Sequence, residues 1–242
     1  AERARDDEIA VVQYFTDMAG IERLAGALFV EQERRVRDPI LREIFRTFVK
    51  DEVRHAHAAQ MLADYYDVHR YRVYQTSPAL RRFTPYFVDA IRYLTPEIAN
   101  AYITAGELIL DVALLRSIND HVHDEMSERA MALINRDESR HIAIDFRMVE
   151  FYASEAHLSE LRAAPSPSLE HRFKAHWALL NVIWRGAPFF KDVFFEPMRI
   201  VDPTGRRLKE AFKRIQMLSQ KPGVQEHAFT RFMLGLQDVY NK

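Results

Sequence analysis

The 242-residue chain contains no cysteine. This absence excludes disulfides, zinc–thiolate sites, iron–sulfur clusters and a cysteine nucleophile. Any metal ion must therefore be held by histidine and carboxylate side chains. Because no disulfide framework is possible, the expected compartment is the cytoplasm.

Glycine, net charge and long apolar runs are also scarce. The chain has only 7 glycines, which argues against a turn-rich β protein, and its formal net charge of -1 offers no broad surface for nucleic acid or an anionic membrane. No apolar run approaches the roughly 18 residues of a transmembrane helix. The charged start, AERARDDE, lacks the apolar segment of a signal peptide. We therefore expect neither a nucleic-acid nor a membrane partner.

Apolar residues recur at helical spacing through nearly the whole chain, which predicts an all-α protein. Long helices are expected at about 7–36, 39–66, 95–117 and from the polar hinge SINDHVHDE to about 160. A crossover at 67–96, with a short helix inside it, joins the two helix pairs. This connection is typical of a ferritin-like four-helix bundle.

The chain is predicted to form a single domain over residues 1–242. The bundle occupies about 7–160, and a helical extension at about 161–242 packs on it. The linker APSPS (164–168) separates the two parts. The helices of the extension are expected to break at Pro188, Pro197, Pro203 and residues 221–223.

Two copies of the pattern Asp-Glu-x-Arg-His stand 86 residues apart, in VKDEVRHAHAAQ (49–60) and NRDESRHIAIDF (135–146). Glu52 and His55 share one helix face, as do Glu138 and His141, and apolar residues surround both pairs. Buried unpaired carboxylates would cost several kcal/mol. Since a metal cation removes that cost, the two pairs are candidate metal ligands. The alternative to metal binding is that the two pairs form solvated charge patches on exposed helix faces.

Two further glutamates lie at matching heights in the partner helices. Antiparallel packing at about 1.5 Å per residue places Glu22 level with Glu52 and Glu107 level with Glu138. Glu31 is a weaker candidate, because it is half a turn out of phase with Glu22 and stands beside two arginines. The sequence thus predicts two half-sites in two similar hairpins.

The aspartate and the arginine of the repeated pattern also have an expected chemical role. Metal-bound histidines usually donate their second ring N–H to a carboxylate. Asp51 and Asp137 are candidates for this role toward the histidine of the opposite helix. Arg54 and Arg140 would then hold these aspartates in place.

The order Glu…DExRH…Glu…DExRH over about residues 7–155 resembles the carboxylate-bridged di-iron oxygenases of the ferritin-like superfamily. The resemblance implies two iron ions that reduce O2 and oxidise an organic substrate. One iron would be held by Glu22, Glu52 and His55, and the other by Glu107, Glu138 and His141, with Glu52 and Glu138 as bridges.

Several positions depart from the patterns of particular subfamilies. Bacterial multicomponent monooxygenases carry a threonine four residues after the third-helix glutamate, where this chain has Asp111. Asp111 is therefore a candidate catalytic proton donor or extra ligand. The radical tyrosine of ribonucleotide reductase small subunits is replaced by Ala59, and the third histidine of arylamine N-oxygenases by Ile134.

From these residues we expect an O2-dependent oxidoreductase that hydroxylates, N-oxygenates or desaturates a small organic molecule. Its partners would be an external electron donor, either a ferredoxin or a reductase, and a second copy of the chain in a homodimer. A Mn/Fe site is equally compatible with the ligands. The alternatives are a radical-generating subunit, a Mn/Fe oxidase, a ferroxidase or iron-storage protein, and a helical module without metal.

Overall fold

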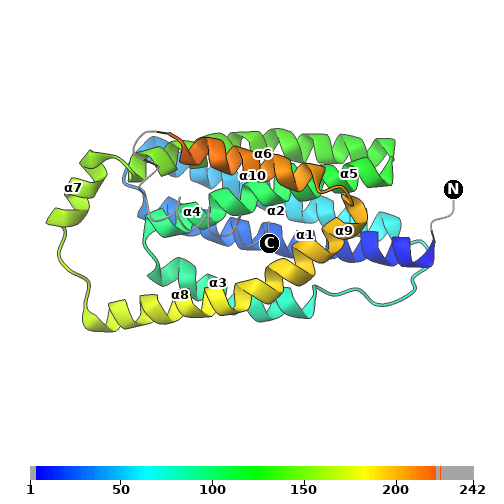
Figure 1. Cartoon of the computed structure of the whole chain (residues 1–242), viewed down its shortest axis with the longest axis horizontal. Helices are drawn as coiled ribbons and strands as arrows, with labels where there is room; N and C mark the ends of the chain where they lie inside the picture. The colour runs from blue at the N-terminus through cyan, green and yellow to red at the C-terminus, as the bar shows by residue number, and fades with distance from the viewer. Residues whose placement is uncertain (1–3, 222–223, 225–242) are drawn as a thin grey trace.

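The structure is a computed structural model that describes residues 4–221 and residue 224, except for the side chains of residues 110–112. Within these residues the regular structure is helical and contains no strand, as expected for an all-α protein. Figure 1 shows most of the helices running along the long axis of the molecule, with α3 and α8 in a separate layer on one side.

The first helix pair consists of α1 (Arg5–Arg35) and α2 (Pro39–Tyr66), which pack against each other along their length. Asp38 caps α2, since its carboxylate accepts hydrogen bonds from the backbone N–H groups of Ile40 (2.7 Å) and Leu41 (3.2 Å). Pro39 occupies the first helical position, where no N–H is needed. Both features follow from the residue types, since Asp is a preferred N-cap and Pro fits the first helical position.

The crossover contains α3 (Pro78–Tyr93) and is fastened to α1 by buried carboxylates. Glu8 accepts a hydrogen bond from the backbone N–H of His69 at 2.9 Å, and Asp17 accepts one from that of Ser77 at 2.5 Å. Arg35 donates to backbone carbonyls at the end of α3, among them those of Ile91 and Leu94. These contacts hold the crossover along α1.

The second helix pair begins with α4 (Pro96–Glu107), continues through a π-helix, η1 (Leu108–Leu115), and α5 (Arg116–Val122), and returns as α6 (Glu125–Tyr152). The polar hinge expected at SINDHVHDE is shorter than predicted. Ser117, Ile118 and Val122 are buried and continue the helix. The chain turns only at His123, which has a left-handed φ of 49°, and at the helix cap Asp124.

The C-terminal part comprises α7 (Glu155–Ala163), α8 (Leu169–Phe189), the π-helix η2 (Phe190–Phe195), α9 (Glu196–Val201) and α10 (Arg206–Ser219). The fourth helix was expected to reach about residue 160 but ends at Tyr152. The expected break at Pro188 is also wrong, because α8 runs through it and into η2. Buried Val182, before the proline, and buried Phe189, after it, anchor the two sides of the proline in the core, which keeps the helix continuous. The expected break at residues 221–223 lies mostly outside the described residues.

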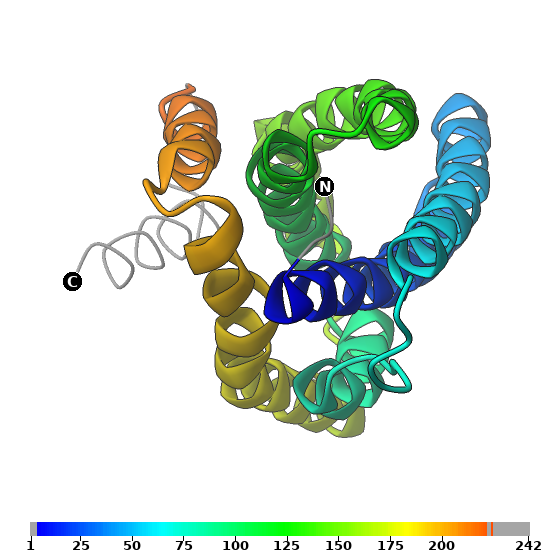
Figure 2. The same cartoon turned by 90° about the vertical axis from the view of Figure 1, so that its right-hand side faces the viewer.

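The four long helical segments surround a common interior. Helix α1 contacts α2 and α4, while α6 contacts α2, α4 and η1. In the end-on view of Figure 2, the pair α1–α2 and the segments α4 to α6 lie on different sides of this interior, and α10 flanks the second pair. Helix α8 packs on α3, and α10 packs on η1.

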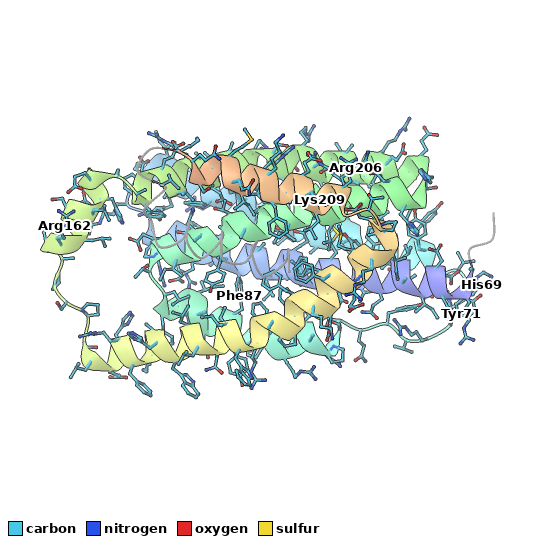
Figure 3. All side chains as sticks on the ribbon, viewed as in Figure 1. His69, Tyr71, Phe87, Arg162, Arg206 and Lys209 are labelled. Atoms are coloured by element: carbon cyan, nitrogen blue, oxygen red, sulfur yellow. The ribbon has the colours of Figure 1, made fainter. Side chains whose placement is uncertain are left out.

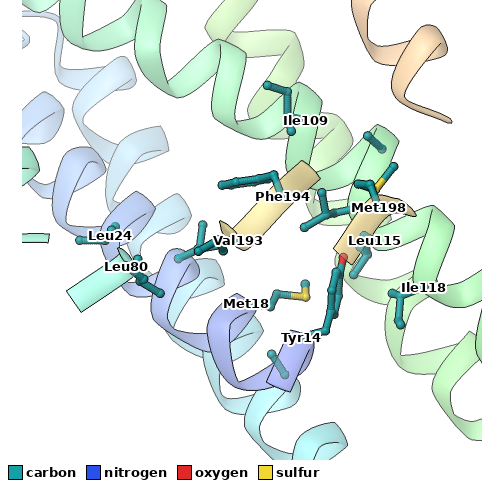
Figure 4. Close-up of a cluster of buried hydrophobic side chains, with 14 of the residues drawn as sticks. Tyr14, Met18, Leu24, Leu80, Ile109, Leu115, Ile118, Val193, Phe194 and Met198 are labelled. Carbon is teal, nitrogen blue, oxygen red and sulfur yellow. The ribbon is translucent and has the colours of Figure 1, made fainter. Parts of the chain in front are cut away.

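The largest apolar cluster joins the C-terminal helices to the long ones. Figure 4 shows Tyr14 and Met18 of α1, Leu115 of η1 and Phe194 and Met198 of the η2–α9 segment gathered in one region. The two ends of the molecule are marked in Figure 3 by His69 and Tyr71 at one end and Arg162 of α7 at the other. None of the helices in the described part of the chain combines the length and apolarity needed to cross a bilayer.

Candidate metal centre

Six acidic and imidazole side chains meet in the interior between the long helices. They come from α1 (Glu22), α2 (Glu52, His55), the end of α4 (Glu107) and α6 (Glu138, His141), and each is at most 3% exposed. The alternative of two solvated charge patches is therefore wrong for these residues. Because antiparallel helices rise by the same distance per residue, the six side chains lie at the same height along the helix axes.

The six residues form two groups that can each hold a metal ion. One group is Glu22, Glu52, His55 and Glu138, and the other is Glu52, Glu107, Glu138 and His141. Within each group the candidate ligand atoms lie within 4.8 Å of one another. Glu52 and Glu138 belong to both groups, so each can bridge two ions.

The histidine rings present the same nitrogen to the carboxylates. His55 Nδ1 lies 2.8 Å from a carboxylate oxygen of Glu138. His141 Nδ1 lies 3.1 Å from Glu52 and 3.2 Å from Glu138. Phe48 packs on the His141 ring, with 4.0 Å between the ring centroids, and Phe29 contacts the same ring edge-on. The apolar rings restrict both the orientation of His141 and its access to water.

Several polar atoms of the centre lie close to another ligand atom but make no well-directed hydrogen bond among the described residues. These include both carboxylate oxygens of Glu52, both ring nitrogens of His55 and Nδ1 of His141. Buried polar atoms without partners are costly, and several carboxylates at one place repel one another. A cation bound between the two groups would satisfy the ligand atoms and neutralise the repulsion, so the residues present fit a pair of metal ions.

The pKa values of the cluster reflect this crowding. Burial, followed by the charge of Glu138, raises the pKa of Glu52 and that of Glu107 well above their ordinary values. Burial alone would lower the pKa of His55, but contact with Glu138 outweighs it and raises this pKa to about 9. Burial would raise the pKa of Glu138, yet contacts with Glu107 and the histidines hold it below its usual value. Without metal, the cluster therefore retains protons that bound cations would displace.

Each histidine directs its other nitrogen toward an aspartate of the opposite helix. His141 Nε2 lies 3.3 Å from Asp51, and His55 Nε2 lies 3.6 Å from Asp137. These are the crossed partners that the sequence predicted. The contact with Asp51 favours a proton on Nε2 of His141, which leaves its Nδ1 free to bind a metal, whereas Asp137 lies beyond hydrogen-bond distance of His55.

Two half-exposed arginines contact these aspartates from the protein surface. Arg54 forms an ion pair with Asp51, and Arg140 bonds to Asp137 at 2.7 Å and to Asp51 at 3.2 Å. Burial would raise the pKa of Asp137, but Arg140 and then His55 hold it below its ordinary value. Asp137 therefore stays ionised beside His55.

Two other candidates from the sequence have different outcomes. Glu31, the rejected rival of Glu22, is partly exposed and pairs with Arg35 at 2.8 Å, away from the centre. Asp111 lies in the π-helix η1, and its side chain is outside the described set. The π-helix itself starts directly after Glu107 and was not predicted. Short π-helical turns in proteins often occur at functional sites.

The sequence analysis missed Asp145, which is fully buried on α6 one helical turn beyond His141. Burial, together with the charges of Glu107 and Glu138, raises its pKa well above the ordinary value. A signal was present, since Asp145 follows Glu138 by seven residues and so lies on the same helix face.

Three other histidines, His121, His171 and His176, lie apart from the centre. His121 bonds to Asp7 at 2.7 Å, near the start of α1. His171 and His176 are exposed on α8, where the first packs near Tyr93 and the second contacts the backbone carbonyl of Arg172. None of them belongs to a group of potential metal ligands found among the described residues.

The centre thus has an inner layer of glutamates and histidines and an outer layer of aspartates and arginines, all supplied by α1, α2, α4 and α6. No family model, curated protein or solved structure matches the chain. The inference of a function therefore rests on this arrangement.

Proposed function

We propose that the protein is a non-haem di-iron oxygenase built on a ferritin-like four-helix bundle. The observation that carries the proposal is the pair of ligand groups that share Glu52 and Glu138. Four glutamates and two histidines, supplied by facing helices as Glu and Glu-x-x-His, form the donor set of di-iron and di-manganese carboxylate proteins. Hard oxygen donors outnumber the nitrogens, which favours Fe or Mn over Zn.

In this proposal each residue of the centre has a defined task. Glu22 and His55 would hold one ion, Glu107 and His141 would hold the other, and the two shared glutamates would contribute to both. Two iron ions bound here would supply electrons to O2. Asp51 and Asp137 orient the histidines, while Phe29 and Phe48 exclude water around His141.

Small side chains beside the ligands favour an organic substrate. Ala19, Ala56 and Ala59 are buried on the helices that carry Glu22, Glu52 and His55. In this proposal they would let a small molecule approach the centre and be hydroxylated, N-oxygenated or desaturated. Because the chain has no flavin or nicotinamide fingerprint, the reducing equivalents would come from an external ferredoxin or reductase.

The test is anaerobic loading with Fe(II), followed by exposure to O2 in a spectrometer. Wild type should bind about two Fe(II) per chain and show an oxygen-dependent absorbance change. Glu138→Ala removes a bridging carboxylate and should lose both. Glu31→Gln, on α1 but outside the centre, should behave as wild type. A wild-type chain that binds neither Fe nor Mn in stoichiometric amounts would contradict the proposal.

A radical-generating role is the second candidate, and Tyr14 is the observation that favours it. Its side chain is 4% exposed, and its hydroxyl has no hydrogen-bond partner within the described part of the chain. Burial and then the charge of Glu22 raise its pKa. A tyrosyl radical signal after O2 exposure, absent from Tyr14→Phe, would favour this role over an oxygenase.

A further inference from the structure

Polar side chains line the contact between α4 and α6, from the metal centre toward α7. On α4 they are Glu97, Asn100, Thr104 and Glu107, spaced by three or four residues and therefore on one helix face. All four are buried, with Asn100 at 0% and Thr104 at 1% exposed. We refer to this contact, together with Asp145 and Tyr152 of α6, as the α4–α6 seam.

Hydrogen bonds hold the middle of the seam together. The Thr104 hydroxyl donates to the backbone carbonyl of Asn100 at 2.7 Å. The side-chain amide of Asn100 in turn donates to the backbone carbonyl of Asp145 at 3.2 Å, which joins α4 to α6. The carboxylate of Asp145 takes no part in these bonds and stays available for another contact.

Three oxygens in the middle of the seam lack a partner among the residues that the structure describes. They are Oδ1 and Oδ2 of Asp145 and Oδ1 of Asn100. An unsatisfied buried polar atom costs about 1–3 kcal/mol, and proteins usually satisfy such atoms with ordered water. The seam is therefore suited to holding water between the metal centre and its outer end.

The outer end of the seam reaches a partly exposed histidine. His157 of α7 contacts Glu97 through its Nε2 at 2.5 Å, and the side chain of His157 is 12% exposed. The ring of Tyr152 lies beside that of His157, with 5.1 Å between the centroids. The outer end of the seam thus carries a titratable group that solvent reaches.

The first helix pair shows that the bundle does not need this polarity for packing. The six ligands repeat with an offset of 85 or 86 residues, so Glu97, Asn100, Thr104 and Asp145 correspond to Val12, Phe15, Ala19 and Ala59. All four counterparts are buried and apolar, and Phe15 stacks on Tyr66. Since apolar residues suffice at the equivalent positions, the polar seam has a purpose other than joining the helices.

We propose that the α4–α6 seam conducts protons between the metal centre and His157, with Asp145 as the inner relay. The inference rests on the proposed function, because oxygen chemistry consumes protons. Insertion of one oxygen atom of O2 into a substrate consumes two electrons from the external reductant and two protons from solvent, and releases one water. A buried centre needs a path for these protons, and hydrogen-bonded groups with water supply one.

The first test uses Mn(II), whose binding displaces protons without O2 chemistry. Mn(II) is mixed with the apo protein and a pH indicator, and bound metal is followed by electron paramagnetic resonance. Asp145→Asn keeps the size of the side chain and the backbone carbonyl that Asn100 contacts. It should bind Mn(II) and release protons in wild-type amounts, but at least about tenfold more slowly.

Tyrosines at equivalent positions of the two halves provide a matched control. Tyr152→Phe removes a hydroxyl of the seam and should slow proton release, whereas Tyr66→Phe removes the equivalent hydroxyl of the apolar half and should not. With Fe(II) and O2, Asp145→Asn should also slow oxidation of the metal, and Asp145→Glu should restore part of the rate.

The outcomes separate the two proposals. Proton release at the wild-type rate in Asp145→Asn would overturn the route. Loss of Mn(II) binding in this variant would overturn it too, because Asp145 would then be a ligand or a structural residue. If the wild type binds neither Mn(II) nor Fe(II), the proposed function is overturned. The proposed proton route along the α4–α6 seam is then overturned as well.

Discussion

At the residue scale, the two buried histidines of the centre each have one nitrogen among glutamates and one beside an aspartate. The contact with Asp51 favours one tautomer of His141, and the contacts with glutamates raise the pKa of both rings. His55 therefore differs from an ordinary surface histidine in its charge. Its raised pKa links the protonation of the centre to folding as well as to metal binding.

This linkage predicts opposite pH dependences for the apo and metal-loaded protein. A group whose pKa is raised from 6.5 to about 9 on folding stabilises the folded state fully below pH 6.5 and loses this contribution as the pH rises through 9. The free energy of unfolding of the apo protein should fall by about 3 kcal/mol over this window. Metal affinity should rise over the same window, because the ligands must be deprotonated.

Urea denaturation and metal titration at several pH values measure the two trends. Glu138→Ala is the matched variant, since it removes the contact that raises the pKa of His55 and should flatten the stability profile. An apo wild-type protein whose stability does not change between pH 6.5 and 9 would contradict the assignment.

At the scale of elements, the positions of the ligands depend on how closely α1 approaches α2. A Cβ atom added to Gly26 would lie 3.3 Å from Cβ of Glu52. That distance is tighter than ordinary contact, so an alanine here would push apart the two helices that carry Glu22 and Glu52. Gly26 is thus required by the close packing of a helix pair at the centre.

The prediction is that Gly26→Ala lowers stability by about 1–3 kcal/mol and weakens metal binding, because the helix shift moves Glu52. Gly106 of α4 is the matched control, since an added Cβ would meet nothing within 4 Å. Gly106→Ala should stabilise the protein by up to about 1 kcal/mol through helix propensity. Thermal unfolding with and without Mn(II) measures both, and equal effects of the two variants would contradict the argument.

At the scale of the whole molecule, the outer face of α8 is apolar and exposed. Its exposed residues follow one stripe at helical spacing: Leu169, Phe173, Trp177, Leu180 and Trp184. Trp184 is 80% exposed, and such a patch usually marks an interaction surface. Pairing this face with itself about Trp177 would cover the stripe along its whole length in a two-fold symmetric contact, so we take a second copy as the occupant.

We therefore expect a homodimer that buries the α8 face. Trp177→Glu should convert the dimer to a monomer in analytical ultracentrifugation, because it places a charge at the centre of an apolar interface, while the circular dichroism spectrum stays unchanged. Ile40→Glu, at another exposed apolar residue, should leave the dimer intact. A wild-type chain that is monomeric at all concentrations would contradict this expectation.

The parts of the fold and of the centre that could be predicted depend on residues close together in the sequence. Periodicity predicts the extent of α1, and periodicity together with the Asp38 cap predicts that of α2, since both signals depend on neighbours along the chain. Helix rise and phase bring six ligands to one level because two antiparallel hairpins are close to regular. Regularity also explains the crossed pairing of Asp51 with His141 and of Asp137 with His55.

The sequence by itself therefore determined the all-α class, the six residues that meet in the interior and the chemistry that they favour. Only the tertiary structure decided that α8 lies on α3 and exposes its apolar face, that α8 runs through Pro188, and that Asp145 faces the α4–α6 seam. The physical reason is that these features depend on which side of each helix another helix covers. Burial of that kind is set by contacts distant in the sequence, which periodicity within one helix does not specify.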